Sequence, residues 1–174
     1  FKKPINHLFK KNDSTLLLIG KTFGHLEQSS FLEEIYSISD GQPPEINLLN
    51  EKNNGENILK IIKNDLVNSV HDVSNGGLII TLAEMCMGSD YGAKITKPKK
   101  LMNLFKYFFG EDQGRYVLEI DKINLGKVEK MLKKNNIFYE NIGSTQKDFF
   151  EIQGELKINI KELRKINNQW YNNY

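Results

Sequence analysis

The sequence has only one cysteine, Cys86, among its 174 residues. A single cysteine excludes an internal disulfide and is typical of proteins from a reducing compartment, so we expect a cytoplasmic protein. Cys86 lies in the apolar run LIITLAEMCM, where a small buried residue is a better interpretation than a nucleophile.

The sequence also lacks an apolar run of about 18 residues, the length at which a transmembrane helix is expected. Its first residues, FKKPINHLFKKND, contain no apolar core of a signal peptide, and the sequence does not begin with Met. We therefore predict that residues 1–14 are a linker from an upstream domain and that residues 15–174 form one domain.

Arginine is scarce, and the charges nearly cancel. Arg115 and Arg164 are the two arginines, and 24 basic residues stand against 22 acidic ones. The densest basic stretch, Lys94 to Lys100, contains a proline, and we interpret it as a solvated loop rather than as a surface for nucleic acid.

The three histidines have no cysteine or carboxylate at the spacing of zinc ligands, so no metal site is predicted.

Hydrophobic patterns predict alternating strands and helices. The predicted strands are 16–20, 67–73, 91–96, 114–120, 138–144 and 149–160. The predicted helices are one capped by Ser29 or Ser30 and ending at Tyr36, one capped by Asn47 and ending near Lys63, one at 78–87, one capped by Asn124, and one at 160–170. This alternation indicates a layered α/β domain, and we expect a mixed β-sheet flanked by helices.

The most distinctive loop is His71-Asp72-Val73-Ser74-Asn75-Gly76-Gly77, which connects a predicted strand to a predicted helix. Glycines allow the backbone to approach a ligand closely, and a helix N-terminus favours an anion. In the alternative interpretation, which the residues alone favour, Ser74 or Asn75 only caps the helix.

Two more loops carry polar groups next to glycines. In one, Glu111, Asp112 and Gln113 precede a predicted strand; adjacent carboxylates in a loop are more often solvated than catalytic, and no acid/base pair is supported. In the other, Lys21 and His25 are suited to contact a phosphate, although the flanking glycines are equally typical of a turn.

Taken in order, these segments resemble a known family. The segments LLLIGKTFGHLEQSSFLEEIYS, GQPPEINL, SVHDVSNGGLIITLAEMCM, YGAKI and FGEDQGRYVLEI, and the closing KINIKELRKINNQW, are similar to the last domain of the synthetase subunit of phosphoribosylformylglycinamidine synthase. The likeness runs from about Thr15 to Trp170. The pair HDVSNGGL and GEDQGRY is its most specific part, because HDVSNGGL alone also fits related synthetases and hydrogenase maturation proteins.

The resemblance implies a ligase of purine biosynthesis. Such an enzyme uses ATP and Mg²⁺ to convert formylglycinamide ribonucleotide and glutamine-derived ammonia into formylglycinamidine ribonucleotide, ADP and phosphate. Its catalytic histidine and metal-binding acids belong to N-terminal domains, so this chain is expected to be inactive alone and to bind no cofactor by itself. The implied partners are the upstream domains, a glutaminase and a small accessory subunit; neither nucleic acid nor a membrane is expected.

The resemblance also suggests which residues face a cleft between domains. None of them is expected to be catalytic or to bind a metal, and the candidates are Lys21, His25, His71, Asp72, Ser74, Gly76, Gly77, Glu111, Asp112 and Gln113. Asp112 stands where the family commonly has Ser, and Asn75 stands where it commonly has Asp or Glu. Two alternatives stay open: a non-catalytic scaffold that docks the glutaminase, and a domain of a related enzyme such as aminoimidazole ribonucleotide synthetase.

Overall fold

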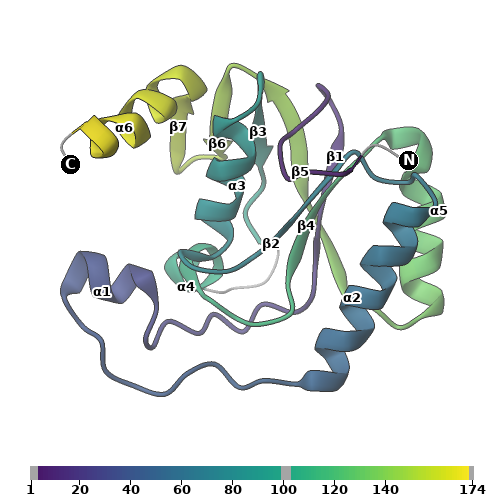
Figure 1. The fold of residues 1–174 in the computed structure, drawn as a ribbon, viewed down its shortest axis with the longest axis horizontal. Helices are drawn as coiled ribbons and strands as arrows, with labels where there is room; N and C mark the ends of the chain where they lie inside the picture. Colours follow the sequence, from purple (N-terminus) through teal and green to yellow (C-terminus); the bar gives the residue numbers. More distant parts are fainter. Residues whose placement is uncertain (1–3, 99–102, 173–174) are drawn as a thin grey trace.

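The computed structural model describes residues 4–98 and 103–172 (Figure 1). That part of the chain contains seven strands and six helices. They are β1 (Thr15–Ile19), α1 (Ser30–Tyr36), α2 (Leu48–Lys63), β2 (Ser69–Asp72), α3 (Gly77–Met87), β3 (Tyr91–Ile95), α4 (Leu104–Phe109), β4 (Tyr116–Ile120), α5 (Lys122–Lys134), β5 (Tyr139–Lys147), β6 (Phe149–Ile152), β7 (Leu156–Asn159) and α6 (Ile160–Asn172).

The strands form one sheet in the order β2-β4-β1-β5-β3-β6-β7. Neighbouring strands are antiparallel except for β3 and β6, which run parallel, so the predicted mixed sheet is confirmed. None of the helices within residues 4–98 and 103–172 is long and apolar enough to cross a bilayer.

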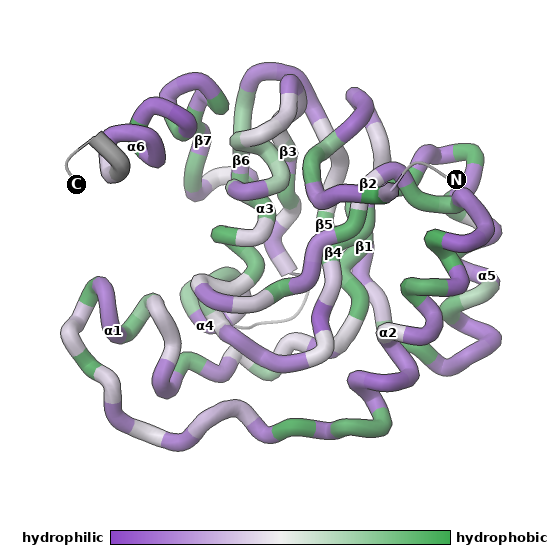
Figure 2. The backbone as a smooth tube through the Cα atoms, viewed as in Figure 1, coloured by the Kyte–Doolittle hydropathy of each residue, from purple (hydrophilic) through white to green (hydrophobic). Residues whose placement is uncertain are grey.

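Helices cover both faces of the sheet, and β1 shows why its sequence is apolar throughout. Leu16 and Leu18 pack into the core on the side of α3 and α4, whereas Leu17 and Ile19 pack on the side of α2 and α5. A strand buried on both faces is a continuous apolar run instead of an alternating one. In Figure 2 this strand is largely hydrophobic, whereas α6 is mainly hydrophilic.

The segment from β1 to α2 extends along the lower edge of the molecule. Helix α1 stands apart from the sheet, and a long connection runs from it to α2 (Figure 1). The predicted caps are confirmed: the Ser29 side chain accepts a hydrogen bond from the Leu32 N–H, and the Asn47 side chain accepts one from the Asn50 N–H. These caps let two helices begin where little else supports the backbone.

Several predicted boundaries are wrong. Helix α5 begins at Lys122 with Asp121 at the N-cap position, so Asn124 lies inside the helix. Its start is set by the end of β4 at Ile120, where the chain leaves the sheet. The run 149–160 is divided into β6 and β7 by a turn in which Gly154 has φ 78°.

Helix α4 was not predicted, because its six residues, LFKYFF, have no helical pattern of polar and apolar positions. The basic stretch 94–100 is not a loop throughout, since Lys94 and Ile95 belong to β3. Lys94 forms an ion pair with Glu151 at 3.9 Å. Residues 99 and 100 of this stretch lie outside the described residues.

Residues before β1 pack onto the domain. Phe9 is 2% exposed and belongs to the core on the α3 side. The fully buried Glu119 carboxylate accepts hydrogen bonds from the N–H groups of Lys10 (2.9 Å) and Lys11 (3.0 Å) and from the Ser69 hydroxyl (2.9 Å). The described part of this predicted linker is therefore held against β4 by a charged acceptor.

Candidate functional site

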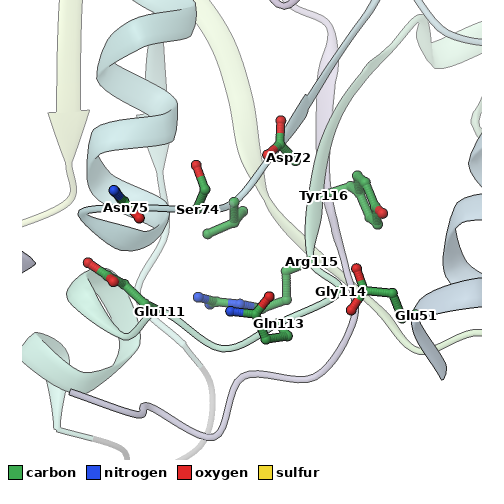
Figure 3. Close-up of a pocket in the computed structure, with 10 residues that line it drawn as sticks. Glu51, Asp72, Ser74, Asn75, Glu111, Gln113, Gly114, Arg115 and Tyr116 are labelled. Carbon is green, nitrogen blue, oxygen red and sulfur yellow. The ribbon is translucent and has the colours of Figure 1, made fainter. Parts of the chain in front are cut away.

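Two of the three predicted loops and the first turn of α2 surround a pocket of about 310 Å³. Its lining residues are Glu51, Asp72, Val73, Ser74, Asn75, Glu111, Gln113, Gly114, Arg115 and Tyr116. In Figure 3, Glu51 and Tyr116 stand on the side of α2, and Asn75 and Glu111 stand on the side of α3. The pocket therefore lies where the end of β2, the start of α3 and the start of β4 meet.

The Glu111 carboxylate occupies the N-terminus of α3. Its Oε1 accepts hydrogen bonds from the N–H groups of Gly76 (2.7 Å) and Ser30 (2.9 Å). The N-cap of α3 is Gly76, with φ 78° and no side-chain cap, so the predicted capping by Ser74 or Asn75 is wrong. The favourable position for an anion at this helix end is filled by a carboxylate of the chain itself.

Gly77 is required for the close packing of α3 against the end of α4. Its φ is 69°, and a Cβ at this position would lie 2.7 Å from the carbonyl oxygen of Gly110 and 2.8 Å from that of Phe108. The backbone of α3 thus touches the backbone at the end of α4. This contact places the loop that carries Glu111 directly beside the start of α3.

Asp112 points away from solvent into the loop that follows β1. Its carboxylate accepts hydrogen bonds from three consecutive N–H groups, those of Phe23 (3.0 Å), Gly24 (2.9 Å) and His25 (3.1 Å). Asp112 is 4% exposed, so the predicted solvated carboxylate is wrong at this position. Three backbone donors around one carboxylate make Asp112 a structural anion of this loop.

Arg115 is the buried counterpart of these carboxylates. It is 1% exposed, its Nη1 lies 3.9 Å from Asp112 Oδ2, and it donates to Thr22 Oγ1 and to the Gly110 and Asp112 carbonyls. Burial lowers the pKa of the Arg115 guanidinium, and the nearby Asp112 carboxylate opposes this shift. Arg115 lines the pocket, but these contacts hold its guanidinium within the wall.

The remaining pocket side chains create a negative potential. Burial raises the pKa of Tyr116, and the carboxylates of Glu51 and Asp72 raise it further. Ser74 and Gln113 are exposed and uncharged. A pocket with this potential accepts hydrogen-bond donors and cations more readily than a bare phosphate.

His71 lies outside the pocket. Its Nδ1 is 3.2 Å from the Asp72 carboxylate, and its Nε2 is 3.0 Å from the carboxylate of Glu84 on α3. The ring of His7 stacks obliquely beside it, with 4.9 Å between ring centroids. Burial lowers the pKa of His7, and His71 lowers it further. His71 therefore connects the N-terminal segment, β2 and α3.

Lys21 and His25 are also outside the pocket. The predicted turn is confirmed, because Gly20 and Gly24 have φ values of 89° and 79°. Lys21 is exposed, and His25 Nε2 lies 2.8 Å from the Gln42 carbonyl oxygen.

The structure therefore separates the candidates into two groups. Asp72, Ser74, Glu111 and Gln113 line the pocket, whereas the other six candidates do not. The other six lining residues are not among the sequence-predicted candidates, and they are Val73, Asn75, Glu51, Gly114, Arg115 and Tyr116. The last three belong to the quoted segment GEDQGRY, but Glu51 has no local signal, because it reaches the pocket from α2.

The donor set does not fit a metal centre or a phosphate cradle. Within residues 4–98 and 103–172, no three His, Cys, Asp or Glu side chains are arranged to hold a metal ion. The α3 N-terminus is filled by Glu111, and the loop amides after β1 are filled by Asp112. Cys86 is buried, and burial raises the pKa of its thiol, so it is the apolar core residue that the sequence predicts.

Comparison with known proteins gives one family and a consistent set of relatives. The family described as "AIR synthase related protein, C-terminal domain" matches residues 11–153. The protein named phosphoribosylformylglycinamidine synthase subunit PurL from Pelagibacter ubique is 46% identical over 165 residues, which is 95% of this chain and 23% of the relative. The protein of the same name from Bradyrhizobium diazoefficiens is 36% identical over the whole chain and 24% of its own length. The chain thus spans about a quarter of these relatives.

Solved structures share the fold at low identity. "T. maritima PurL complexed with FGAR" superposes with a TM-score of 0.75 at 13% identity, over 92% of this chain and 29% of that one. The hydrogenase maturation protein HypE of E. coli superposes with a TM-score of 0.62 at 14% identity, over 89% of this chain and 51% of that one. This likeness extends to proteins of different names, so it shows the fold alone.

Proposed function

Because the chain belongs to the family of C-terminal domains of AIR synthase-related proteins, we propose that it is the C-terminal domain of a phosphoribosylformylglycinamidine synthase. The observation that supports this most strongly is the 46% identity over 95% of the chain with a relative of that name. In this proposal, residues 15–174 form the domain, and residues 1–14 connect it to the upstream part of a protein about four times as long.

The proposed reaction replaces an amide oxygen of formylglycinamide ribonucleotide by ammonia, with ATP converted to ADP and phosphate. Two of the solved structures that share the fold are "T. maritima PurL complexed with ATP" and "T. maritima PurL complexed with ADP". Within residues 4–98 and 103–172 no side chains are arranged to hold a metal ion, and Glu111 and Asp112 fill the backbone donors next to the pocket, so we assign the Mg²⁺-nucleotide chemistry to the upstream domains. This chain supplies a shaped and negatively charged wall.

Exposed apolar side chains support the proposal that this wall is covered in the whole protein. Phe23 is 75% exposed and Leu48 is 76% exposed, on the loop after β1 and at the start of α2. Exposed apolar surface rimmed by polar groups is typical of an interface. The pocket then becomes part of a cleft between this domain and its neighbour.

Within that cleft we assign two roles to the candidate residues. Asp72, Ser74 and Gln113 contact the ligand, because their side chains are exposed at the pocket. Glu111 and Asp112 position the loops that carry these groups, since their carboxylates are bound to backbone N–H groups. We also assign a ligand contact to Glu51 and Tyr116, and a positioning role to Gly76 and Gly77 at the start of α3.

The proposed partners are the upstream domains of the same polypeptide, a glutaminase that supplies ammonia and a small accessory subunit. Another solved structure with this fold is "Structure of PurLQS from Thermotoga maritima", a name that describes an assembly of that protein. We propose a cytoplasmic location, as for other enzymes that work on soluble nucleotides.

A scaffold role is the second candidate, and the saturated hydrogen bonds of Glu111 and Asp112 favour it. In this interpretation the domain stabilises the tandem enzyme and contacts no ligand. The two candidates differ in what they predict for the exposed pocket side chains. Substitutions there change kinetics only if a ligand touches them.

The first test is the intact mass of the native gene product, which should be several times that of this chain. The second test compares Asp72→Asn and Gln113→Ala in that full-length protein with Glu56→Gln, a solvent-exposed control on α2. If the pocket contacts a ligand, each pocket variant should lower kcat/KM for amidine formation by about tenfold, the effect of roughly 1.4 kcal/mol. Unchanged kinetics in both variants would favour the scaffold.

A further inference from the structure

Residues 22–51, here called the acidic arm, differ in charge from the rest of the chain. The acidic arm contains six carboxylates and no lysine or arginine, namely Glu27, Glu33, Glu34, Asp40, Glu45 and Glu51. All 24 basic residues and the other 16 acidic residues therefore lie elsewhere. Such segregation gives one edge of a nearly neutral domain a strong negative field.

The same arm exposes an unusual amount of apolar surface. Seven of its large apolar side chains are between 45% and 76% exposed, and they are Phe23, Ile35, Tyr36, Ile38, Ile46, Leu48 and Leu49. These are seven of the fifteen exposed large apolar residues in the described part of the chain. No residue of α1 is buried. Apolar side chains gathered on one segment and mixed with charges are typical of a docking surface.

The acidic arm is held in place, so its surface is formed before any partner binds. The ring of Phe31 lies 4.4 Å from that of Phe109 and 5.6 Å from that of Phe105, between ring centroids. The connection after α1 is tied back by the Gln42 N–H, which donates to Glu27 Oε2 at 2.8 Å. A preorganised surface loses little conformational entropy on binding.

Four carboxylates of the acidic arm are available for a partner. Glu33, Glu34, Asp40 and Glu45 are exposed, and no ion pair joins them to another described residue. A basic surface would complement them, whereas an anionic lipid headgroup or a nucleic acid would be repelled.

We propose that the acidic arm docks against a lysine-bearing surface of the polypeptide region that lies outside these 174 residues in the same protein. This inference depends on the proposed function, because it takes the protein to be about four times as long, as its relatives are. The apolar side chains supply the centre of the contact, and the carboxylates select a basic partner. The arm ends at Glu51, so the docked region also covers the pocket.

The test is zero-length carbodiimide cross-linking of the full-length gene product, which joins carboxylates to lysine amines in direct contact, followed by peptide mass spectrometry. We expect Glu33, Glu34, Asp40 or Glu45 to be joined to lysines outside residues 1–174 of the same polypeptide. Glu162, an exposed carboxylate on α6, is the matched control and should give few such products. The charge-reversing pair Glu33→Lys and Glu34→Lys should lower the yield of arm cross-links at least severalfold.

Three results would overturn the inference: no arm cross-links, cross-links only to a separate subunit, or cross-links only to the lysines of α5 in a second copy. The failure of the inference is distinguishable from that of the proposed function. An active amidine-forming enzyme without arm cross-links refutes the docking surface alone. A native product no longer than this chain refutes the proposed function first.

Discussion

The Glu111 carboxylate accepts a hydrogen bond from the backbone N–H of Gly76, with 2.7 Å between Oε1 and N. The same oxygen accepts from the Ser30 N–H, so one side chain joins the starts of α1 and α3. The loop that resembles a ligand-binding segment thus uses its first carboxylate to hold the fold together. The groups left for a ligand are the exposed ones beside it.

Replacing Glu111 by Ala should lower the free energy of unfolding by about 1.5–3 kcal/mol, the typical contribution of hydrogen bonds to a charged group. Both helix starts lose their acceptor in this variant. Urea unfolding at neutral pH, followed by circular dichroism, measures the change. Gln113→Ala is the matched control two residues away, because this side chain is exposed. Equal stability of both variants would contradict the role of Glu111.

Local sequence signals predicted the elements whose causes are local. The continuous apolar run Leu16–Ile19 is a strand buried on both faces, and Ser29 and Asn47 cap the helices that follow them. Each capping hydrogen bond joins residues only three apart along the chain, and the strand is recognisable from its own apolar run. For the same reason the alternation of elements was sufficient to predict a mixed α/β sheet.

The site could be predicted only in part, because its defining contacts join distant segments. Ser74 and Asn75 are residue types that commonly cap helices. The acceptor at the start of α3 is instead Glu111, which binds the Gly76 N–H from 35 residues away along the chain. Asp112, the residue after Glu111, accepts hydrogen bonds from N–H groups of the loop after β1, which lie 87 to 89 residues away along the chain. Glu51 reaches the pocket from α2. No window of sequence contains both members of any of these pairs.

Asp112→Asn should destabilise the domain more than the loss of a solvated carboxylate would. An amide NH₂ replaces one of the two oxygens that accept backbone hydrogen bonds, and the buried Arg115 loses its negative partner. Leaving a buried charge without its partner costs about 3–5 kcal/mol. We expect a loss in that range in chemical denaturation, against less than about 0.5 kcal/mol for the exposed control Asp90→Asn. A small effect at Asp112 would mean that Arg115 is adequately solvated.

Two glycine-to-alanine substitutions should have opposite effects on stability. Gly77→Ala should cost at least about 2 kcal/mol, because a positive φ costs an L-residue roughly 1–2 kcal/mol and the Cβ would also meet the Gly110 carbonyl. Gly126 lies inside α5, and a Cβ there would meet no atom within 4 Å. Gly126→Ala should therefore stabilise the domain by about 0.5–1 kcal/mol. Thermal unfolding of both variants gives the comparison, and stabilisation at Gly77 would contradict the packing of α3 against α4.

The negative potential of the pocket predicts how Tyr116 titrates. Its phenol loses a proton to become an anion, so burial and the carboxylates of Glu51 and Asp72 raise its pKa. Removing one negative charge by Glu51→Gln should therefore move the pKa of Tyr116 back towards that of a free tyrosine, while the burial contribution remains.

Carbon-13 NMR of the tyrosine ring between about pH 9 and pH 12, which brackets the ordinary tyrosine pKa, follows this titration residue by residue. Glu56→Gln removes the same charge from the solvent-exposed side of α2 and should leave Tyr116 nearly unchanged. An unchanged pKa in the Glu51 variant would mean that burial alone causes the shift. The carboxylates would then be too well solvated to exclude a phosphate, and the assignment of nucleotide chemistry to the upstream domains would lose its electrostatic support.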